Sequence, residues 1–472
     1  MKYRLRAGWA LVAVVSVVAL AVSTARAEEE FPLDLQNRVK DLRDGIRMSV
    51  KDGNAAQHQK DMQKAAHASI MRLTDEINRD LKSGAGRKPT PMSQIVQEAN
   101  SLIPAMPILE KQSNDVQRQV YERKKDYIQA YGQYVANVLH DEILLPKDKP
   151  IKYELLVRVN AARILARLGE SGFVKTDDKL VDTVDIALDV IQNPKEFDAV
   201  RLYALQALKN LLALPNPAGM DKSLLAKTPE REKQIILALI QFVSRPVTIS
   251  ADASQEEIDG WRYIRREAIR ALGYVRYPVI RDEKEKKVIV NPAFWLLRFA
   301  AADPMINPTP SLYERAEALI GFLQLNPDPQ MEMDYASWYA ALAFRDLASE
   351  FSGREVKLPG AAPAPGAGGA AQLRDYMPWK LIWNKLEILF KPWVVGWEGT
   401  HANAPRVPDQ MVTELLQLCQ AQIFQPCVGV SQLPQNVEYE TISSWLQNQQ
   451  ANVTAKTLFK DDPDSEIKVP RN

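Results

Sequence analysis

The sequence predicts an all-α fold in which helical hairpins stack along the middle of the chain. One helical pattern recurs four times, and each copy is preceded by a second apolar helical pattern. In the recurring pattern an arginine is followed by alanine three residues later and by apolar residues four, seven and ten residues later. These offsets lie on one face of a helix with about 3.6 residues per turn. One hairpin cannot bury its own apolar face, so neighbouring hairpins must stack on it.

The copies share small and apolar positions in register. Their arginines are Arg158, Arg201, Arg265 and Arg315. Their alanines, three residues on, are Ala161, Ala204, Ala268 and Ala318. An alanine at this position lets a neighbouring helix approach closely. The preceding helices are expected over residues 126–143, 178–192, 229–244 and 292–301. The last two start clearly, because Thr228-Pro229 and Asn291-Pro292 each place a capping side chain before a proline at the first helical position.

The V-R-x-x-A-x-x-x-L pattern resembles the second helix of the HEAT/armadillo-like α-solenoid family, and "DAVRLYALQAL" is its closest match. The resemblance covers residues 126–350. It implies a HEAT-like α-solenoid whose second helices line a groove. The arginines are 43, 64 and 50 residues apart, whereas the family repeats at about 40–47 residues. The excess indicates two insertions, an acidic loop at 245–260 and a predicted β-hairpin at 278–292, where β-branched runs flank a charged centre.

The chain is expected to divide into five regions. They are a signal peptide at 1–27, an N-terminal helical region at 28–125, the solenoid at 126–352, an Ala/Pro/Gly-rich linker at 353–372 and a Trp-rich C-terminal helical region at 373–472. A helix at 333–351 is expected to close the solenoid. The linker has too few large apolar side chains to order itself. Within the N-terminal region, an apolar stripe over 54–84 predicts one long amphipathic helix.

Residues 1–27 have the layout of a secretory signal peptide. A basic start is followed by an apolar run of 16 residues and by the cleavage pattern Ala25-x-Ala27. An uncleaved membrane anchor is the alternative, although a bilayer span needs about 20 apolar residues. The expected location is a bacterial periplasm, the cell envelope or the extracellular space. Without these residues, which hold four basic side chains, 56 basic residues face 59 acidic ones. Such a balance argues against a nucleic-acid partner.

The sequence contains no recognisable catalytic, metal-binding or cofactor-binding motif, so no cofactor is expected. The histidines His58, His67, His140 and His401 lack metal-ligand spacing and are interpreted as surface residues. The acidic run at 461–466 lacks the glycine and distal glutamate of an EF-hand loop, which favours a solvated tail. Cys419 and Cys427 are expected to form a disulfide in an oxidising compartment, with two buried thiols as the alternative.

Two surface features suggest binding. The first combines an arginine stripe, spaced by four residues opposite the apolar face of one helix, with nearby aromatic side chains. Its residues are Trp261, Arg262, Tyr263, Arg266 and Arg270. Guanidinium groups pair well with carboxylates and phosphates, so the stripe is a candidate site for an acidic partner segment or an anionic polymer. The alternative is an ordinary solvated face, paired in part with Glu256 and Glu257.

The second feature is the Trp-rich segment at 377–399. Its candidate membrane- or partner-docking residues are Trp379, Trp383, Phe390, Trp393 and Trp397. An amphipathic helix with tryptophan and lysine can lie on a membrane surface. Alternatively, the same apolar stripe packs into the core of a small C-terminal domain.

Together these features predict an exported, non-catalytic scaffold or adaptor that binds a protein partner, or an anionic polymer, through a solenoid groove. This step from fold to function is an analogy. One alternative is an exported all-α polysaccharide hydrolase or lyase, which would use a pair of carboxylates. Another is a peripheral membrane adaptor that uses residues 377–399.

Overall fold

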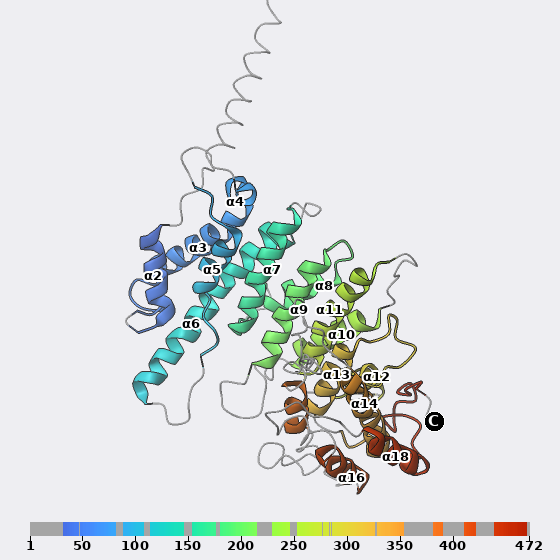
Figure 1. The fold of residues 1–472 in the computed structure, drawn as a ribbon. Helices are drawn as coiled ribbons and strands as arrows, with labels where there is room; N and C mark the ends of the chain where they lie inside the picture. Colours follow the sequence, from blue (N-terminus) through green and yellow to red (C-terminus); the bar gives the residue numbers. More distant parts are fainter. Residues whose placement is uncertain are drawn as a thin grey trace, which may run out of the picture. The chain divides into compact units, whose positions relative to one another are not determined.

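The computed structural model describes a mostly helical chain, which confirms the all-α prediction (Figure 1). Within the described part, the only sheet is the predicted hairpin, where β1 (Ile280–Arg281) pairs antiparallel with β2 (Val288–Val290). The structure describes residues 32–469 except 47, 82–87, 108–113, 146–152, 176–179, 215–228, 246–252, 276, 283, 285, 326–327, 354–380, 390–409 and 422–438. The predicted signal peptide and almost all of the predicted linker therefore lie outside the described residues.

The chain forms two compact units. Unit 1 comprises residues 1–104, 114–164 and 177–181, and unit 2 comprises 105–113, 165–176 and 182–472. The division falls inside α7 (Leu155–Glu170). Unit 1 thus contains the N-terminal helices together with the first predicted hairpin up to residue 164.

In unit 1, α3 packs against α2, α5 and α6. The bounds are α2 Leu33–Asp44, α3 Ala55–Met71, α4 Glu76–Asp80, α5 Met92–Ser101 and α6 Asp115–Val138, and α6 continues into the π-helical turn η2 Leu139–Leu144. The single long helix predicted over 54–84 is wrong. α3 ends at Met71, a 3-10 turn at Arg72–Thr74 follows, and Asp75 caps a new helix by accepting a hydrogen bond from the Ile77 amide.

In unit 2, helices pair in the predicted order, because α8 packs on α9, α10 on α11, and α12 on α13. The bounds are α8 Thr183–Gln192, α9 Asp198–Ala213, α10 Pro229–Ser244, α11 Gln255–Leu272, α12 Pro292–Ala300, α13 Leu312–Gln324, α14 Met333–Gly353, α16 Gln410–Cys419 and α18 Tyr439–Gln449. A further helix covers residues 381–389. α11 also lies between α9 and α13, and α14 packs against α13, α16 and α18 (Figure 1).

The four recurring alanines are fully buried. Ala161, Ala204, Ala268 and Ala318 each have no exposed surface. The buried face predicted for the recurring helices is therefore confirmed. As predicted, Asn291 caps α12 by accepting a hydrogen bond from the Phe294 amide. Thr228 lies outside the described residues.

The recurring arginines tie a helix to the end of the one before it. The Arg158 guanidinium donates to the carbonyls of Ile143 and Leu144, at 2.8 and 2.9 Å. Arg201 donates to the Asn193 carbonyl at 2.6 Å, just after α8. The last carbonyls of a helix have no partner within it. An arginine from the next helix satisfies them and places a positive charge at the negative end of the helix dipole.

Arg315 repeats this arrangement and Arg265 departs from it. Arg315 donates to the carbonyl of Ala300, the last residue of α12, at 3.0 Å. Arg265 instead reaches forward, to the Pro308 carbonyl at 2.9 Å and to the Glu314 carboxylate at 2.6 Å. The same sequence position therefore joins the two helices of one hairpin in three copies, whereas in the fourth it reaches the following hairpin.

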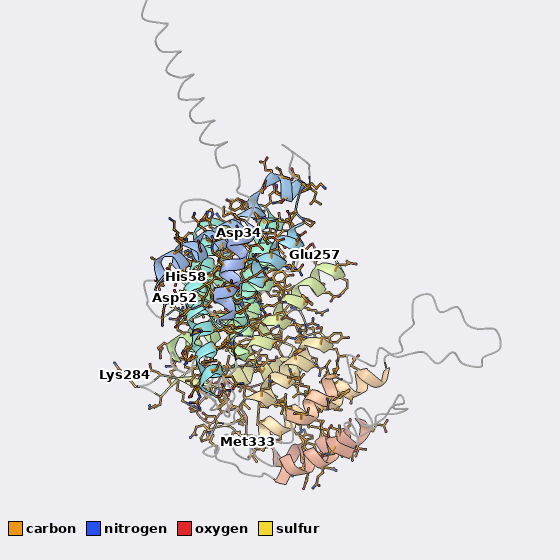
Figure 2. The ribbon with its side chains drawn as sticks, turned by 90° about the vertical axis from the view of Figure 1, so that its left-hand side faces the viewer. Asp34, Asp52, His58, Glu257, Lys284 and Met333 are labelled. Carbon is orange, nitrogen blue, oxygen red and sulfur yellow. The ribbon has the colours of Figure 1, made fainter. Side chains whose placement is uncertain are left out.

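Two loop predictions need correction. The acidic insertion at 245–260 is helical in its second half, because Ser254 and Glu257 form a capping box that starts α11 at Gln255. Figure 2 shows Glu257 in this first turn. The acidic run at 461–466 is not a solvated tail. Asp461 pairs with Arg281 of β1 at 2.5 Å, and the buried Asp462 accepts a hydrogen bond from Asn291 at 2.9 Å.

The histidine interpretation is wrong for His58. Its ring is buried, and its Nε2 lies 2.8 Å from an Asp52 carboxylate oxygen, beside the start of α3 (Figure 2). His67 is exposed, as expected for a surface residue. His140 contacts Asp141 with its Nδ1, and His401 lies outside the described residues.

Candidate anion-binding surface on α11

α11 carries the arginine stripe on the side away from its buried residues. Ile264, Ala268 and Leu272 are buried, as predicted. The stripe residues, four positions apart, are partly exposed. The spacing therefore identified the correct face of the helix.

Trp261 does not add aromatic surface, so this part of the prediction is wrong. Its side chain is 7% exposed and packs against Phe242 of α10, with ring centroids 5.3 Å apart. The guanidinium of Arg245 lies 4.4 Å from the centroid of the Trp261 ring. Trp261 is three positions before Ile264 and so falls at the edge of the buried face. Tyr263, by contrast, is 45% exposed.

Arg262 holds a neighbouring loop. Its guanidinium donates to the Thr309 carbonyl at 2.9 and 3.1 Å and pairs with Asp259 one turn earlier. Glu257 is engaged in the capping box with Ser254. The carboxylates that pair with the stripe are thus not the predicted Glu256 and Glu257.

Arg270 belongs to a half-buried ion network. It pairs with Glu267 on its own helix and with Glu317 of α13, both at 2.5 Å. Glu267 also pairs with Lys209 of α9 at 3.0 Å. Burial alone would lower the pKa of the Arg270 guanidinium, but the carboxylates of Glu317 and Glu267 outweigh it and raise that pKa. The network therefore bridges three successive second helices and keeps Arg270 charged.

Arg266 is the stripe residue that has no carboxylate partner among the described residues. Its guanidinium lies over two aromatic rings, 4.8 Å from the centroid of Tyr263 and 5.7 Å from that of Tyr313. Its buried Nε has no hydrogen-bond acceptor. Stacking on aromatic rings holds the charge in place without neutralising it, so Arg266 remains able to bind an anion.

A pocket of about 240 Å³ adjoins the stripe in unit 2. Its polar lining side chains are Lys209, Arg270, Tyr274, Glu317, Gln324 and Lys385. Lys385 comes from the helix at 381–389 and has no ion pair in the described part of the chain. Three cationic groups thus line the pocket. The nearby carboxylates of Glu267 and Glu317 already pair with Lys209 and Arg270. No pattern in the sequence indicates Lys209 and Lys385, because they come from elements far from α11 in the chain.

The Trp-rich segment contributes to the core. Trp383 is 0% exposed and stacks on Phe344 of α14, with ring centroids 6.4 Å apart. Of the two interpretations of this residue, core packing is therefore confirmed and docking is wrong, because the Trp383 ring is covered. Trp379, Phe390, Trp393 and Trp397 lie outside the described residues. None of the described helices is long and apolar enough to cross a membrane.

The predicted disulfide is not formed. Cys419 is a free thiol on the buried side of α16, and burial raises its pKa. Cys427 lies outside the described residues. Among the described residues, no group of three or more histidine, cysteine, aspartate or glutamate side chains could hold a metal ion.

Comparisons with protein-family models, curated proteins and solved structures found no match for this chain.

Proposed function

We propose that the protein is an exported, non-catalytic scaffold with a HEAT-like α-solenoid, which binds an acidic segment of a partner protein on the face formed by α9, α11 and α13. The order of packing, with α11 between α9 and α13, supports a solenoid. The signal-peptide layout of residues 1–27 supports export.

The proposal rests on Arg266 and Lys385, two cations that have no carboxylate partner among the described residues. They lie beside the network in which Glu267 and Glu317 already pair with Arg270 and Lys209. A segment with several carboxylates would pair with these two cations at separate positions and leave the Arg270 pairs intact. Carboxylates match this chemistry, because guanidinium and ammonium groups form charge-assisted hydrogen bonds with them.

A short protein segment suits this surface better than a long uniform polyanion. Among the described stripe and pocket residues, only Arg266 and Lys385 are cations without a carboxylate partner, so most charges of a long polyanion would find no partner on this surface. The exposed Tyr263 beside Arg266 also favours a protein, since tyrosine and arginine are enriched in protein interfaces.

The proposal predicts that charge reversal at these two cations weakens binding of an acidic peptide. The probe is a fluorescent decapeptide of alternating glutamate and glycine, followed by anisotropy. The double variant Arg266→Glu/Lys385→Glu is expected to bind it about tenfold more weakly, because each exposed ionic contact contributes about 0.2–1 kcal/mol and reversal adds repulsion. The difference should shrink at high salt.

The matched control is Lys284→Glu/Lys287→Glu, which makes the same change of charge at exposed lysines of the β-hairpin (Figure 2 labels Lys284). It should leave the affinity unchanged. Equal peptide affinity in both double variants would contradict the proposal. Binding of heparin but not of the peptide would assign the surface to anionic polymers instead.

A further inference from the structure

Besides the pocket in unit 2, the described residues form a pocket of about 390 Å³ in unit 1, between α3 and the end of α6. α3 contributes Gln63, Lys64 and His67 to its lining. The volume lies within the range of about 300–1,000 Å³ that is typical of small-molecule sites. Apart from Ala68 and Val138, all of its lining residues are polar.

The opposite wall comes from α6 and the π-helical turn η2. Tyr134 and Asn137 belong to α6, and Asp141 and Glu142 to η2. The Leu145 amide donates to the His140 carbonyl, five residues back, at 2.9 Å. π-helical turns are rare and occur frequently at functional sites. The turn that carries both carboxylates is therefore an independent indication of a site.

Several of these groups keep hydrogen-bonding capacity for a ligand. His67 Nε2 and a Glu142 oxygen are 3.5 Å apart, which is too long for a strong hydrogen bond. The Asn137 side-chain oxygen accepts from Gln133, which leaves its amide nitrogen able to donate. The ring of Tyr134 forms part of the wall. Partial burial raises the pKa of its hydroxyl, which therefore stays protonated.

The chemistry of this lining excludes most ligand classes. The two carboxylates, Asp141 and Glu142, outnumber the one ammonium group, Lys64, so the lining disfavours an anion. The described residues provide no metal-binding group. Seven polar side chains make the pocket unsuited to an apolar molecule. Carboxylates, amides and an aromatic ring together match a molecule with many hydroxyl groups and an apolar ring face.

We propose that this pocket binds a neutral sugar unit, with Asn137 and Glu142 hydrogen-bonding its polar groups and Tyr134 packing against its ring. The site is in a different unit from the α11 surface and does not depend on the function proposed for that surface.

The test is ligand-observed NMR and calorimetry on the full chain, with N-acetylglucosamine as the probe and inorganic phosphate as the contrast. N-acetylglucosamine is expected to bind and phosphate is not. Asn137→Leu and Glu142→Ala should each weaken sugar binding about tenfold, because each removes a hydrogen bond to the ligand. Gln119→Leu and Glu122→Ala make matched changes at exposed positions of α6 and should not alter binding.

The proposal is overturned if N-acetylglucosamine does not bind, or if its affinity is unchanged in both pocket variants. Binding of phosphate in place of the sugar would likewise overturn it. Thermal unfolding of each variant separates loss of a contact from loss of the fold.

Discussion

Replacing Glu314 by alanine is expected to destabilise unit 2 by about 3–5 kcal/mol, because it leaves a charged guanidinium buried without its counter-ion. Arg265 and Glu314 are 1% and 0% exposed, and their charged groups are 2.6 Å apart. Glu314 also completes the capping box of α13 by accepting from the Ser311 amide. After the substitution, Arg265 would keep only the Pro308 carbonyl and the face of the Phe299 ring.

Urea unfolding of the full chain measures this effect. The control is Glu256→Ala, which removes an exposed carboxylate from the first turn of α11 and should change stability by less than about 0.5 kcal/mol. The double variant Arg265→Leu/Glu314→Leu should recover part of the loss, because apolar residues can replace a buried ion pair. If Glu314→Ala were as stable as the control, loss of the counter-ion would not destabilise unit 2, contrary to the expected result.

The second large effect is expected for Gly169→Ala at the end of α7. A Cβ atom at Gly169 would lie 2.4 Å from the Ala207 carbonyl oxygen and 3.0 Å from the Ala207 carbonyl carbon and Cα. These are backbone atoms of α9, so they cannot rotate away as a side chain could. The expected cost is about 3 kcal/mol, at the upper end of the range for overpacking.

Gly260→Ala is the matched control for Gly169→Ala. Gly260 lies inside α11, and a Cβ there would meet nothing within 4 Å. Alanine should stabilise α11 by about 0.5–1 kcal/mol, because it restricts the unfolded chain and favours the helix. If Gly169→Ala lowers the free energy of unfolding and Gly260→Ala raises it, the close approach of α7 and α9 requires glycine. Equal midpoints of unfolding would contradict that requirement.

Features encoded by local spacing could be predicted from the sequence. The alanine three residues after each arginine identified the buried face, since helical periodicity alone fixes which positions face inward. The Asn291-Pro292 start of α12 was equally readable, because a cap and a proline act within one turn. The break after Met71 was not, since the stripe of apolar residues continued across it.

The candidate site could be predicted only in part, because its charges depend on partners distant in the sequence. The spacing of the stripe gave the correct face of α11. It could not show that Glu317 of α13 engages Arg270, or that Lys209 and Lys385 join the same surface. The sequence predicted aromatic surface at Trp261 and allowed either docking or core packing for Trp383. Packing against Phe242 and Phe344 buries both rings.

Site-specific photo-crosslinking in the producing cells tests whether an acidic partner segment binds at α11. Benzoylphenylalanine replaces the exposed Tyr263 beside Arg266, and Val116, an exposed residue of unit 1, carries the same group as a control. The predicted result is an adduct on the protein through position 263 only. Its partner peptide should be rich in aspartate or glutamate, and Arg266→Glu/Lys385→Glu should abolish it. An adduct that persists in this double variant, or no adduct specific to position 263, would contradict the claim.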